Sequence, residues 1–389
     1  MKIRFVTPWY GEFAGGAEVA ARKLAENLFS EGVDVEILTT CCRTPFEDWW
    51  ADYYIPGKYK INKVPVLRFP TNKESADLYH LVNHKIINRL PVSKEDELNF
   101  MRGNINSHAL IAHIKQNRDC YYVFIPYLYG PAVWGINALP ERSILIPCLH
   151  DEPIAKWEIV RGMFIKARKV IFLSEEERVL ASHLYSADMS AMPVLGVGVD
   201  TDISHDGKRF RGKYGIKDRF IVYAGRKDRG KNVLLLIDYF KHYLDLHPSD
   251  LKLVFIGGGD PSLVPINDTY FTDLGYIPEQ DKYDAMAASI AVCNLSENES
   301  FSFVLMEGWL AGRPAIVSSK GSVTSGHCLR SKGGFPVSDA DEFCTRLHQL
   351  VRDDILSREM GSSGRGYVLG NYTWDKVLSR YIETFKELG

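Results

Sequence analysis

Short apolar runs alternate with amphipathic runs along this chain of 389 residues, and the alternation occurs twice. In the first half, runs rich in Val and Ile, such as IRFVTP and VDVEILTT, predict strands. Later runs such as YYVFIPY are apolar throughout, which is typical of strands buried on both faces of a parallel sheet. Between them, residues 17–32 have helical periodicity and end at Gly32, which suits the left-handed cap of a helix. A second set of strand and helix patterns begins at RFIVYAG, residues 219–225.

Strands that alternate with helices predict parallel, doubly wound sheets, so the expected fold class is α/β with two Rossmann-like domains. The polar, glycine-containing stretch 196–210 separates the two sets. We therefore expect an N-terminal domain over residues 1–200 and a C-terminal domain over residues 201–372. Residues 373–389 predict an amphipathic helix that packs back on the N-terminal domain.

Composition and charge fit a soluble globular protein, with 46% hydrophobic and 25% charged residues. Lys and Arg (47) nearly balance Asp and Glu (49), so the bulk charge gives no reason to expect a nucleic-acid partner. The seven cysteines show no zinc-ligand spacing and mostly lie in apolar runs, which favours a reducing cytoplasm. The stretch MKIRFVTPWYG predicts a buried strand rather than a signal peptide, and no apolar run is long enough to cross a bilayer.

A glycine-containing loop, WYGEFAGGAE, follows the first predicted strand and includes Gly15 and Gly16. Glycines between a strand and a helix let the backbone approach a phosphate, and a helix N-terminus favours negative charge. The spacing does not meet the dinucleotide fingerprint, and the second strand ends in Thr39-Thr40 rather than in an acid. A nicotinamide dehydrogenase is therefore disfavoured. Close packing of the strand on the helix is the alternative role for these glycines.

A second loop between a predicted strand and a predicted helix, YAGRKDRGKN, contains glycine and also carries positive charge. Arg226 lies just past a predicted strand, and Lys231 precedes Asn232, a candidate N-cap for the next helix. Two cations around a glycine turn at a helix start suit a diphosphate, because Arg binds it as a bidentate fork and Lys as a point charge. The alternative is a solvated basic loop, in which Lys227 and Arg229 would face water.

The segment ESFSFVLME places Glu299 in a predicted loop and Glu307 about one turn inside an apolar helix. The N–H groups of Ser300, Phe301 and Ser302 would be unpaired donors at the helix N-terminus, directed into the same space. This arrangement predicts an anion site bordered by two carboxylates, and a carboxylate that accepts from two vicinal hydroxyls suits a ribose. The alternative is a solvated helix start with a surface glutamate.

The segment ESFSFVLMEGWLAGRPAIVS closely resembles the E-x7-E signature of retaining GT-B glycosyltransferases of family 4. Further motifs match in order over nearly the whole chain: GGAE, LHD at 149–151, GVD at 198–200, YAGR with Lys231, and LGYIPEQD at 274–281. The resemblance implies the GT-B fold, in which two doubly wound Rossmann-like domains face each other across a cleft. Ser300 and Ser302 depart from the family pattern, which usually has glycine there, and Gly308-Trp309 replaces a pair of the Ala-Met type.

The resemblance also implies a role for each matching residue. Arg226 and Lys231 would hold the diphosphate of a nucleotide diphosphate sugar, and Glu307 would bind the ribose hydroxyls. Glu299, with the N–H groups of the helix start, would contact the transferred sugar and its phosphate. Gly15 and Gly16 would close over the phosphates. His150 would orient a donor hydroxyl, and the backbone of Ile277 would lie beside the base. For His150, a strand-end histidine bonded to the backbone is the alternative.

The implied reaction is front-side transfer of the sugar to an acceptor hydroxyl with retention, in the biosynthesis of a polysaccharide, glycolipid or other glycoconjugate. No cofactor or metal is expected, because the cationic pair and the helix N–H groups would stabilise the charge on the leaving diphosphate. The acceptor would be a sugar, a lipid-linked sugar or another hydroxyl compound. A noncatalytic nucleotide-sugar-binding subunit and a sugar-nucleotide epimerase of the same fold are the alternatives.

Residues 43–60 form an aromatic and basic insertion after the second predicted strand. Its aromatic side chains are expected to shape the acceptor pocket by stacking on sugar faces, or to contact lipid headgroups on the inner face of a membrane. The alternative is that they cover the edge of the sheet. The sequence leaves the nucleobase, the sugar, the acceptor and the oligomeric state open.

Overall fold

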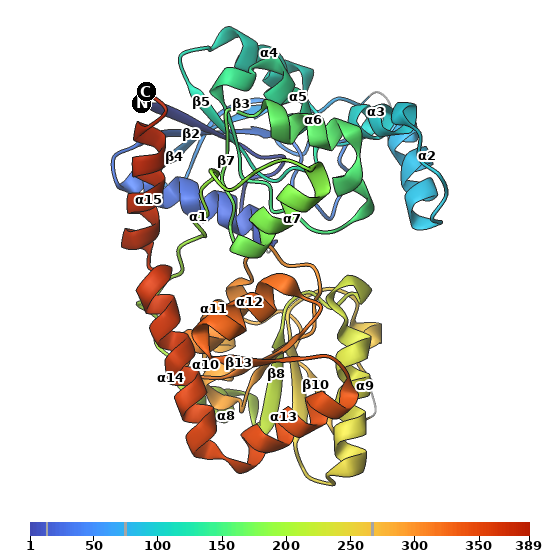
Figure 1. Ribbon diagram of the computed structural model, residues 1–389, viewed down its shortest axis with the longest axis vertical. Coiled ribbons are helices and arrows are strands. Elements are labelled where there is room, and N and C mark those ends of the chain that lie inside the picture. The colour runs from blue at the N-terminus through green and yellow to red at the C-terminus, as the bar shows by residue number, and fades with distance from the viewer. Residues whose placement is uncertain (13–14, 74–75, 266–267) are drawn as a thin grey trace. The chain divides into compact units, whose positions relative to one another are not determined.

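The computed structural model describes residues 1–12, 15–73, 76–265 and 268–389, which divide into two units (Figure 1). The first unit comprises Met1–Gly198 together with Val377–Gly389, and the second comprises Val199–Lys376. Each unit has its own sheet with helices packed around it, so the predicted α/β class with two Rossmann-like domains is confirmed. Among the described residues, no helix is both long and apolar enough to cross a bilayer.

The first unit contains a seven-stranded sheet in the order β3-β4-β2-β1-β5-β6-β7. Neighbouring strands are parallel except β3 and β4, which form an antiparallel hairpin at one edge. The central strands are apolar because helices cover both faces; Phe5 and Val123, for example, are fully buried. The strands are β1 (Lys2–Val6), β2 (Asp34–Thr40), β3 (Gly57–Ile61), β4 (Val64–Phe69), β5 (Tyr121–Phe124), β6 (Ser143–Leu145) and β7 (Lys169–Val170).

The helix predicted from the sequence in the first unit is present and ends where its glycine cap predicts. The helix predicted over 17–32 is α1 (Gly16–Ser30), and Gly32 has the positive φ of 81° that a left-handed cap requires. The last helix, α15 (Trp374–Lys386), passes from the second unit into the first, where the Tyr381 hydroxyl donates to the Gly196 carbonyl at 3.1 Å. The other helices are α2 (Ala76–Ile87), α3 (Lys94–Gly103), α4 (His108–Gln116), α5 (Gly130–Ala138), α6 (Glu158–Lys166) and α7 (Glu175–Tyr185).

The second unit contains a six-stranded, all-parallel sheet in the order β10-β9-β8-β11-β12-β13. The strands are β8 (Phe220–Ala224), β9 (Lys252–Ile256), β10 (Phe271–Asp273), β11 (Val292–Asn294), β12 (Ala315–Ser318) and β13 (Gly334–Val337). The helices are α8 (Gly207–Tyr214), α9 (Val233–Leu246), α10 (Glu279–Ala288), α11 (Phe303–Leu310), α12 (Ser322–Ser331), α13 (Ala340–Arg352) and α14 (Asp354–Asn371).

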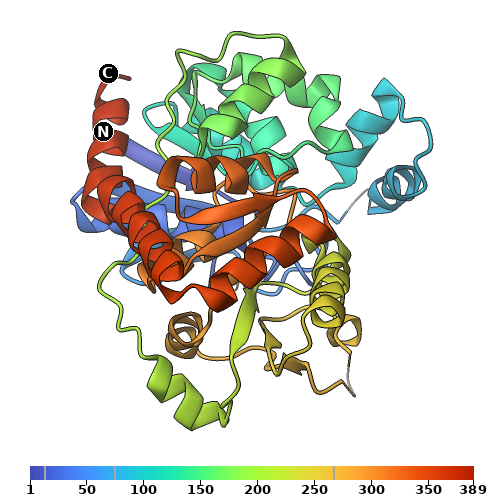
Figure 2. The same ribbon diagram turned by 60° about the horizontal axis from the view of Figure 1, so that its bottom comes forward.

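Alternate side chains of β8 supply two apolar cores on the two faces of this sheet. Ile221 packs in the cluster formed with α9 and α13, whereas Val222 packs in the cluster formed with α8 and α10. Figure 2 shows α9 (yellow) and α13 (orange-red) side by side against one face. Burial on both faces explains why β8 and β9 read as continuous apolar runs.

The strand order defines where a ligand would bind in the second unit. From β8 the sheet grows to one side through β9 and β10, and from β11 it grows to the other side. The boundary between β8 and β11 is therefore a topological switch point, and ligands of open α/β sheets bind at the carboxyl ends of the strands there. The loops after β8 and β11 carry Arg226, Lys231 and Glu299.

Candidate functional site

Lys231 and Glu299 form an ion pair at the switch point of the second unit. The Lys231 Nζ atom lies 2.8 Å from the Glu299 Oε1 atom, and the two side chains are 30% and 15% exposed. The Asn294 side-chain amide, at the end of β11, donates to the same carboxylate oxygen at 3.3 Å. Two motifs that lie 68 residues apart in the chain are thus brought into direct contact.

The loop after β8 is built around Asp228. Its carboxylate accepts from the Lys231 backbone N–H at 2.9 Å and so caps the short 3-10 turn Arg229–Lys231. Its other oxygen accepts from Arg226 Nε at 2.5 Å, while the Arg226 side chain is about half exposed. Asp228 therefore fixes both cations of the predicted diphosphate pair from within the loop that carries them.

One prediction for this loop was wrong, and one was confirmed. Lys227 does not face water: it is buried, and its ammonium donates to Asp273 Oδ1 at 3.0 Å and to the Gly257 carbonyl, because a desolvated ammonium needs such partners. Asn232 is the N-cap residue of α9, but its side chain makes no capping bond. Instead it donates to the Leu295 carbonyl at 2.9 Å, which ties the loop after β8 to the loop after β11.

The start of α11 presents backbone donors. No hydrogen bond from the N–H groups of Ser300, Phe301 or Ser302 is recorded to any residue that the structure describes. The Phe301 ring is buried and packs edge-on against Tyr372, with ring centroids 5.1 Å apart, which holds this segment in place. Orphan N–H groups at a helix N-terminus favour an anion.

Ser302 adopts a left-handed conformation, with φ 67° and ψ 77°, at a position where the resemblance leads us to expect glycine. A side chain in this region is strained, because its Cβ crowds the backbone. We expect Ser302→Gly to raise the free energy of unfolding by about 0.5–1 kcal/mol, measured by urea unfolding. Ser300→Gly, at a position without positive φ, is the matched control and is expected to lower it by a similar amount. A destabilised Ser302→Gly protein would contradict this interpretation.

Glu307 is a largely buried residue of α11, so the alternative of a surface glutamate was wrong. Its side chain is 12% exposed, and its Oε1 atom lies 2.8 Å from Nζ of Lys282, on α10. Its Oε2 atom is buried and has no hydrogen-bond partner among the described residues. Lys282 was not identified from the sequence. Ile277 lies just before α10 and packs, partly buried, against the core on that face.

The remaining candidates belong to the first unit. Gly15 is the N-cap residue of α1 and Gly16 is its first residue; α1 follows β1, which neighbours β5 at the switch point of this sheet. A Cβ atom on Gly15 would lie 2.1 Å from Glu18 Oε2, so a larger residue would displace that side chain. Phe13 and Ala14 of the same loop lie outside the described residues.

His150 follows β6, lies near the partly buried carboxylate of Glu152, and is preceded by Leu149, which bonds to the buried Glu177. Its Nδ1 atom is 3.9 Å from Glu152 Oε1, which accepts a 2.7 Å hydrogen bond from the Tyr127 hydroxyl; burial raises the pKa of Glu152. The Leu149 N–H donates to Glu177 at 2.6 Å, and burial raises the pKa of Glu177 to about 8 despite its backbone donors. These contacts fix the segment that carries His150, and the sequence analysis identified neither carboxylate as part of it.

Three comparisons with known proteins bear on this arrangement. Residues 218–353, which include Arg226, Lys231, Glu299 and Glu307, match the family model described as Glycosyl transferases group 1. Curated relatives include an uncharacterized glycosyltransferase of Methanocaldococcus jannaschii, 21% identical over 99% of this chain and 98% of the relative. Another is D-inositol 3-phosphate glycosyltransferase of Corynebacterium jeikeium, 23% identical over 96% of this chain and 92% of the relative.

Solved structures of the same fold include HepE of Anabaena in complex with UDP, with a TM-score of 0.73, 16% identity and full coverage of both chains. A second is the α,α-trehalose 6-phosphate synthase of Burkholderia multivorans, with a TM-score of 0.73 and 10% identity, covering 100% of this chain and 96% of that chain. These neighbours have the GT-B fold. The comparisons support a GT-B glycosyltransferase.

The aromatic insertion at residues 43–60 lies in the first unit, where much of it is packed. Trp49 contacts Trp9, with ring centroids 5.4 Å apart, and Trp50 donates from its indole to the Gly103 carbonyl at 2.8 Å. Tyr54 lies over the guanidinium of buried Arg68 at 3.8 Å. These contacts pack Trp49, Trp50 and Tyr54 against other residues of the first unit.

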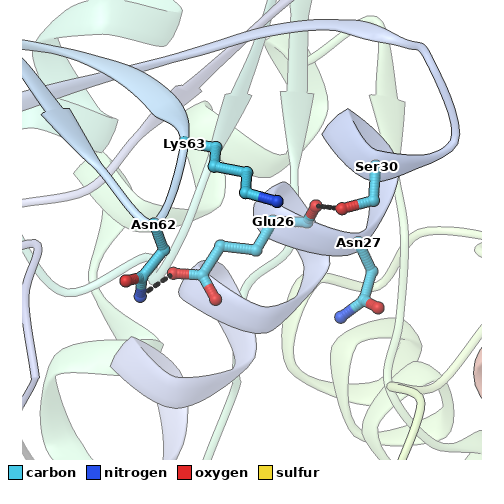
Figure 3. Close-up of a pocket in the computed structure, with 5 residues that line it drawn as sticks. All are labelled: Glu26, Asn27, Ser30, Asn62 and Lys63. Atoms are coloured by element: carbon cyan, nitrogen blue, oxygen red, sulfur yellow. Dashed lines mark hydrogen bonds between the residues drawn. The ribbon is translucent and has the colours of Figure 1, made fainter.

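The first unit also has a shallow hollow between α1 and the β3–β4 turn (Figure 3). The Asn62 amide donates to Glu26 Oε1 at 2.9 Å, and the Ser30 hydroxyl donates to the Glu26 carbonyl at 3.0 Å. Asn27 and Lys63 complete the lining. None of the residues predicted to bind a donor lines this hollow.

Proposed function

We propose that this chain is a retaining glycosyltransferase of family 4, which moves a hexosyl group from a nucleotide diphosphate sugar to an acceptor hydroxyl. The product would belong to polysaccharide, glycolipid or other glycoconjugate biosynthesis. The observation that supports this most strongly is the ion pair of Lys231 with Glu299 at the switch point. A carboxylate, a cation and free helix N–H groups meet there, as a sugar attached to a diphosphate requires.

In the proposed complex the donor diphosphate takes the place of Glu299 as the partner of Lys231. Arg226 and the N–H groups at the start of α11 add donors to the same phosphates. Charge grows on the diphosphate as the bond from sugar C1 to the phosphate oxygen breaks, and preorganised donors stabilise that charge. Glu299, released from Lys231, then faces the positive charge that develops on the sugar ring. Glu307 accepts from the ribose hydroxyls, and the backbone near Ile277 lies by the base.

Retention follows from attack on the face that the leaving group departs from. The acceptor oxygen forms the new bond to C1, and its proton passes to the departing phosphate oxygen, so the products are the glycoside and a nucleoside diphosphate. We assign the acceptor to the first unit and the donor to the second. In the first unit, His150 would orient a donor hydroxyl, and Gly15 and Gly16 would permit close approach of the backbone to phosphate.

We further propose that the protein works in the cytoplasm, with peripheral contact to the inner face of the membrane through the insertion at residues 43–60. All seven cysteines are buried free thiols, which suits a reducing compartment. Phe46, Tyr53 and Ile55 of the insertion are exposed, at 56%, 59% and 78%. Exposed aromatic and aliphatic side chains of this kind favour an interface with lipid headgroups.

A panel of UDP-, GDP- and ADP-sugars in a thermal-shift assay tests the donor assignment, and a UDP-sugar is the first choice because HepE was solved with UDP. Turnover is then followed by nucleotide release, and the anomeric configuration of the product by NMR. Binding without turnover against any acceptor would favour a noncatalytic subunit. Conversion of the donor sugar without an acceptor would favour an epimerase. A product of inverted configuration would rule out retention.

Turnover is expected to be independent of divalent metal, because Arg226, Lys231 and the α11 N–H groups supply the charge that a metal otherwise provides. Initial rates with the best donor should be the same in EDTA and in Mg²⁺ or Mn²⁺. Activity that EDTA abolishes and that only a divalent cation restores would contradict this assignment.

A further inference from the structure

Glu307 is held by an ion pair that leaves one of its oxygens unused. Oε1 lies 2.8 Å from Lys282 Nζ, whereas Oε2 is buried and has no partner among the described residues. A buried acceptor without a hydrogen bond is costly, and such groups are normally satisfied by protein, water or ligand. One carboxylate oxygen of Glu307 is therefore left unsatisfied by the described residues, and a ligand hydroxyl is one group that would satisfy it.

Lys282 is itself fixed from several sides. Its ammonium lies 4.7 Å from the centre of the Tyr283 ring and 3.9 Å from Glu279 Oε1. Tyr283 donates from its hydroxyl to the same Glu279 oxygen at 2.8 Å. With 21% of its side chain exposed, Lys282 offers a localised positive charge rather than a mobile surface lysine.

We propose that Lys282 is a positioning residue that makes Glu307 selective for ribose. The inference rests on the proposed function, in which Glu307 binds the ribose of the donor. The ammonium holds Oε1, so that Oε2 is the oxygen left to accept a hydrogen bond from the ligand. A ribose hydroxyl satisfies Oε2, whereas a deoxyribose leaves it unpaired. Lys282 therefore sets the preference for ribonucleotide over deoxyribonucleotide donors.

The test measures dissociation constants by calorimetry for UDP, GDP and ADP and for their 2′-deoxy and 3′-deoxy forms. Wild-type protein is expected to bind the preferred ribonucleotide about tenfold or more tightly than at least one deoxy form, which is the size of a hydrogen bond to a charged group. In Lys282→Met this ratio should fall to about 1–2, because affinity is lost for the ribonucleotide and little changed for the deoxy form. Lys282→Arg, which keeps a cation, should retain at least half of the wild-type ratio.

Lys213→Met is the matched control. Lys213 pairs with Asp281 Oδ2 at 2.6 Å, so this variant also removes an ion pair to α10, but one that does not include Glu307. It is expected to keep the wild-type ratio. This separates positioning of Glu307 from a general effect on the stability of α10, which thermal unfolding of each variant measures.

Several outcomes would overturn the inference. They are a wild-type protein that binds ribo and deoxy forms equally, a Lys282→Met protein that keeps the ratio, and a Lys282→Arg protein with a ratio of 1. If Lys282→Met does not fold, the ratio in Lys282→Arg decides. A wild-type protein that binds none of the nucleotides instead refutes the proposed function, so the two failures are distinguishable.

Discussion

Lys231→Ala is expected to lower kcat/KM roughly 30- to 1000-fold. This factor corresponds to about 2–4 kcal/mol of lost transition-state stabilisation, which is typical for the loss of one preorganised donor to a developing oxyanion. The structure adds a second reason. Lys231 neutralises Glu299, whose side chain is only 15% exposed, and its removal leaves that carboxylate without its cation at the proposed diphosphate site. Arg226→Ala should fall near the lower end of this range, because the Arg226 side chain is about half exposed and solvent screens its charge.

Steady-state kinetics of the wild type and four variants measure this effect. Arg229→Ala is the control, since Arg229 is an exposed cation of the same turn that no motif assigns to the diphosphate. Its kcat/KM should stay within about twofold of wild type, as for an ordinary surface charge. The Arg226→Ala/Lys231→Ala double mutant should lose less than the sum of the two single losses, because both cations act on one diphosphate. Wild-type kcat/KM in Lys231→Ala would refute the diphosphate assignment.

The parts of the fold that could be predicted from the sequence are those buried on both faces. Interior strands such as β8 and β9 are continuous apolar runs, because helices cover both sides of the sheet. The strands that gave no clear signal, β3, β10 and β13, all lie at sheet edges. An edge strand is partly solvated and short, so it carries polar residues, as GKYKI does in β3.

Some residues of the candidate site could also be predicted from the sequence, whereas the contacts between them could not. Local motifs identified Glu299, Glu307 and Lys231 as candidates, because their spacing from the neighbouring strand and helix ends is recognisable. Their contacts depend on which loops the topology brings together, and Lys282, which lies in no such motif, is 25 residues from its partner. Lys227 was misassigned for the same reason: only the packing of the loop after β8 against Gly257 and Asp273 shows that it is buried.

Substitutions of the two glutamates of ESFSFVLME are expected to affect different quantities, donor affinity for Glu307 and kcat for Glu299. In the proposed complex Glu307 contacts a ribose that is held alike in the ground and transition states, so Glu307→Gln should weaken donor binding by about tenfold and leave kcat nearly unchanged. Glu299 gains its interaction only as positive charge develops on the sugar, so Glu299→Gln should lower kcat by about 100-fold or more. Nucleoside diphosphate affinity and kcat, measured side by side on both variants, check this contrast.

The ion pair with Lys231 sharpens the prediction for Glu299. In the free protein this carboxylate is paired with Lys231, the cation that is proposed to bind the diphosphate. A glutamine at position 299 would leave Lys231 without that ionic partner and so available to the diphosphate. Glu299→Gln should therefore bind the free nucleoside diphosphate at least as tightly as wild type while turning over far more slowly. A structural role predicts another pattern, because breaking a partly buried ion pair would lower stability and affinity together. Full kcat in Glu299→Gln would mean that Glu299 only stabilises the loop before α11, and the proposed role of Glu299 in sugar transfer would be wrong.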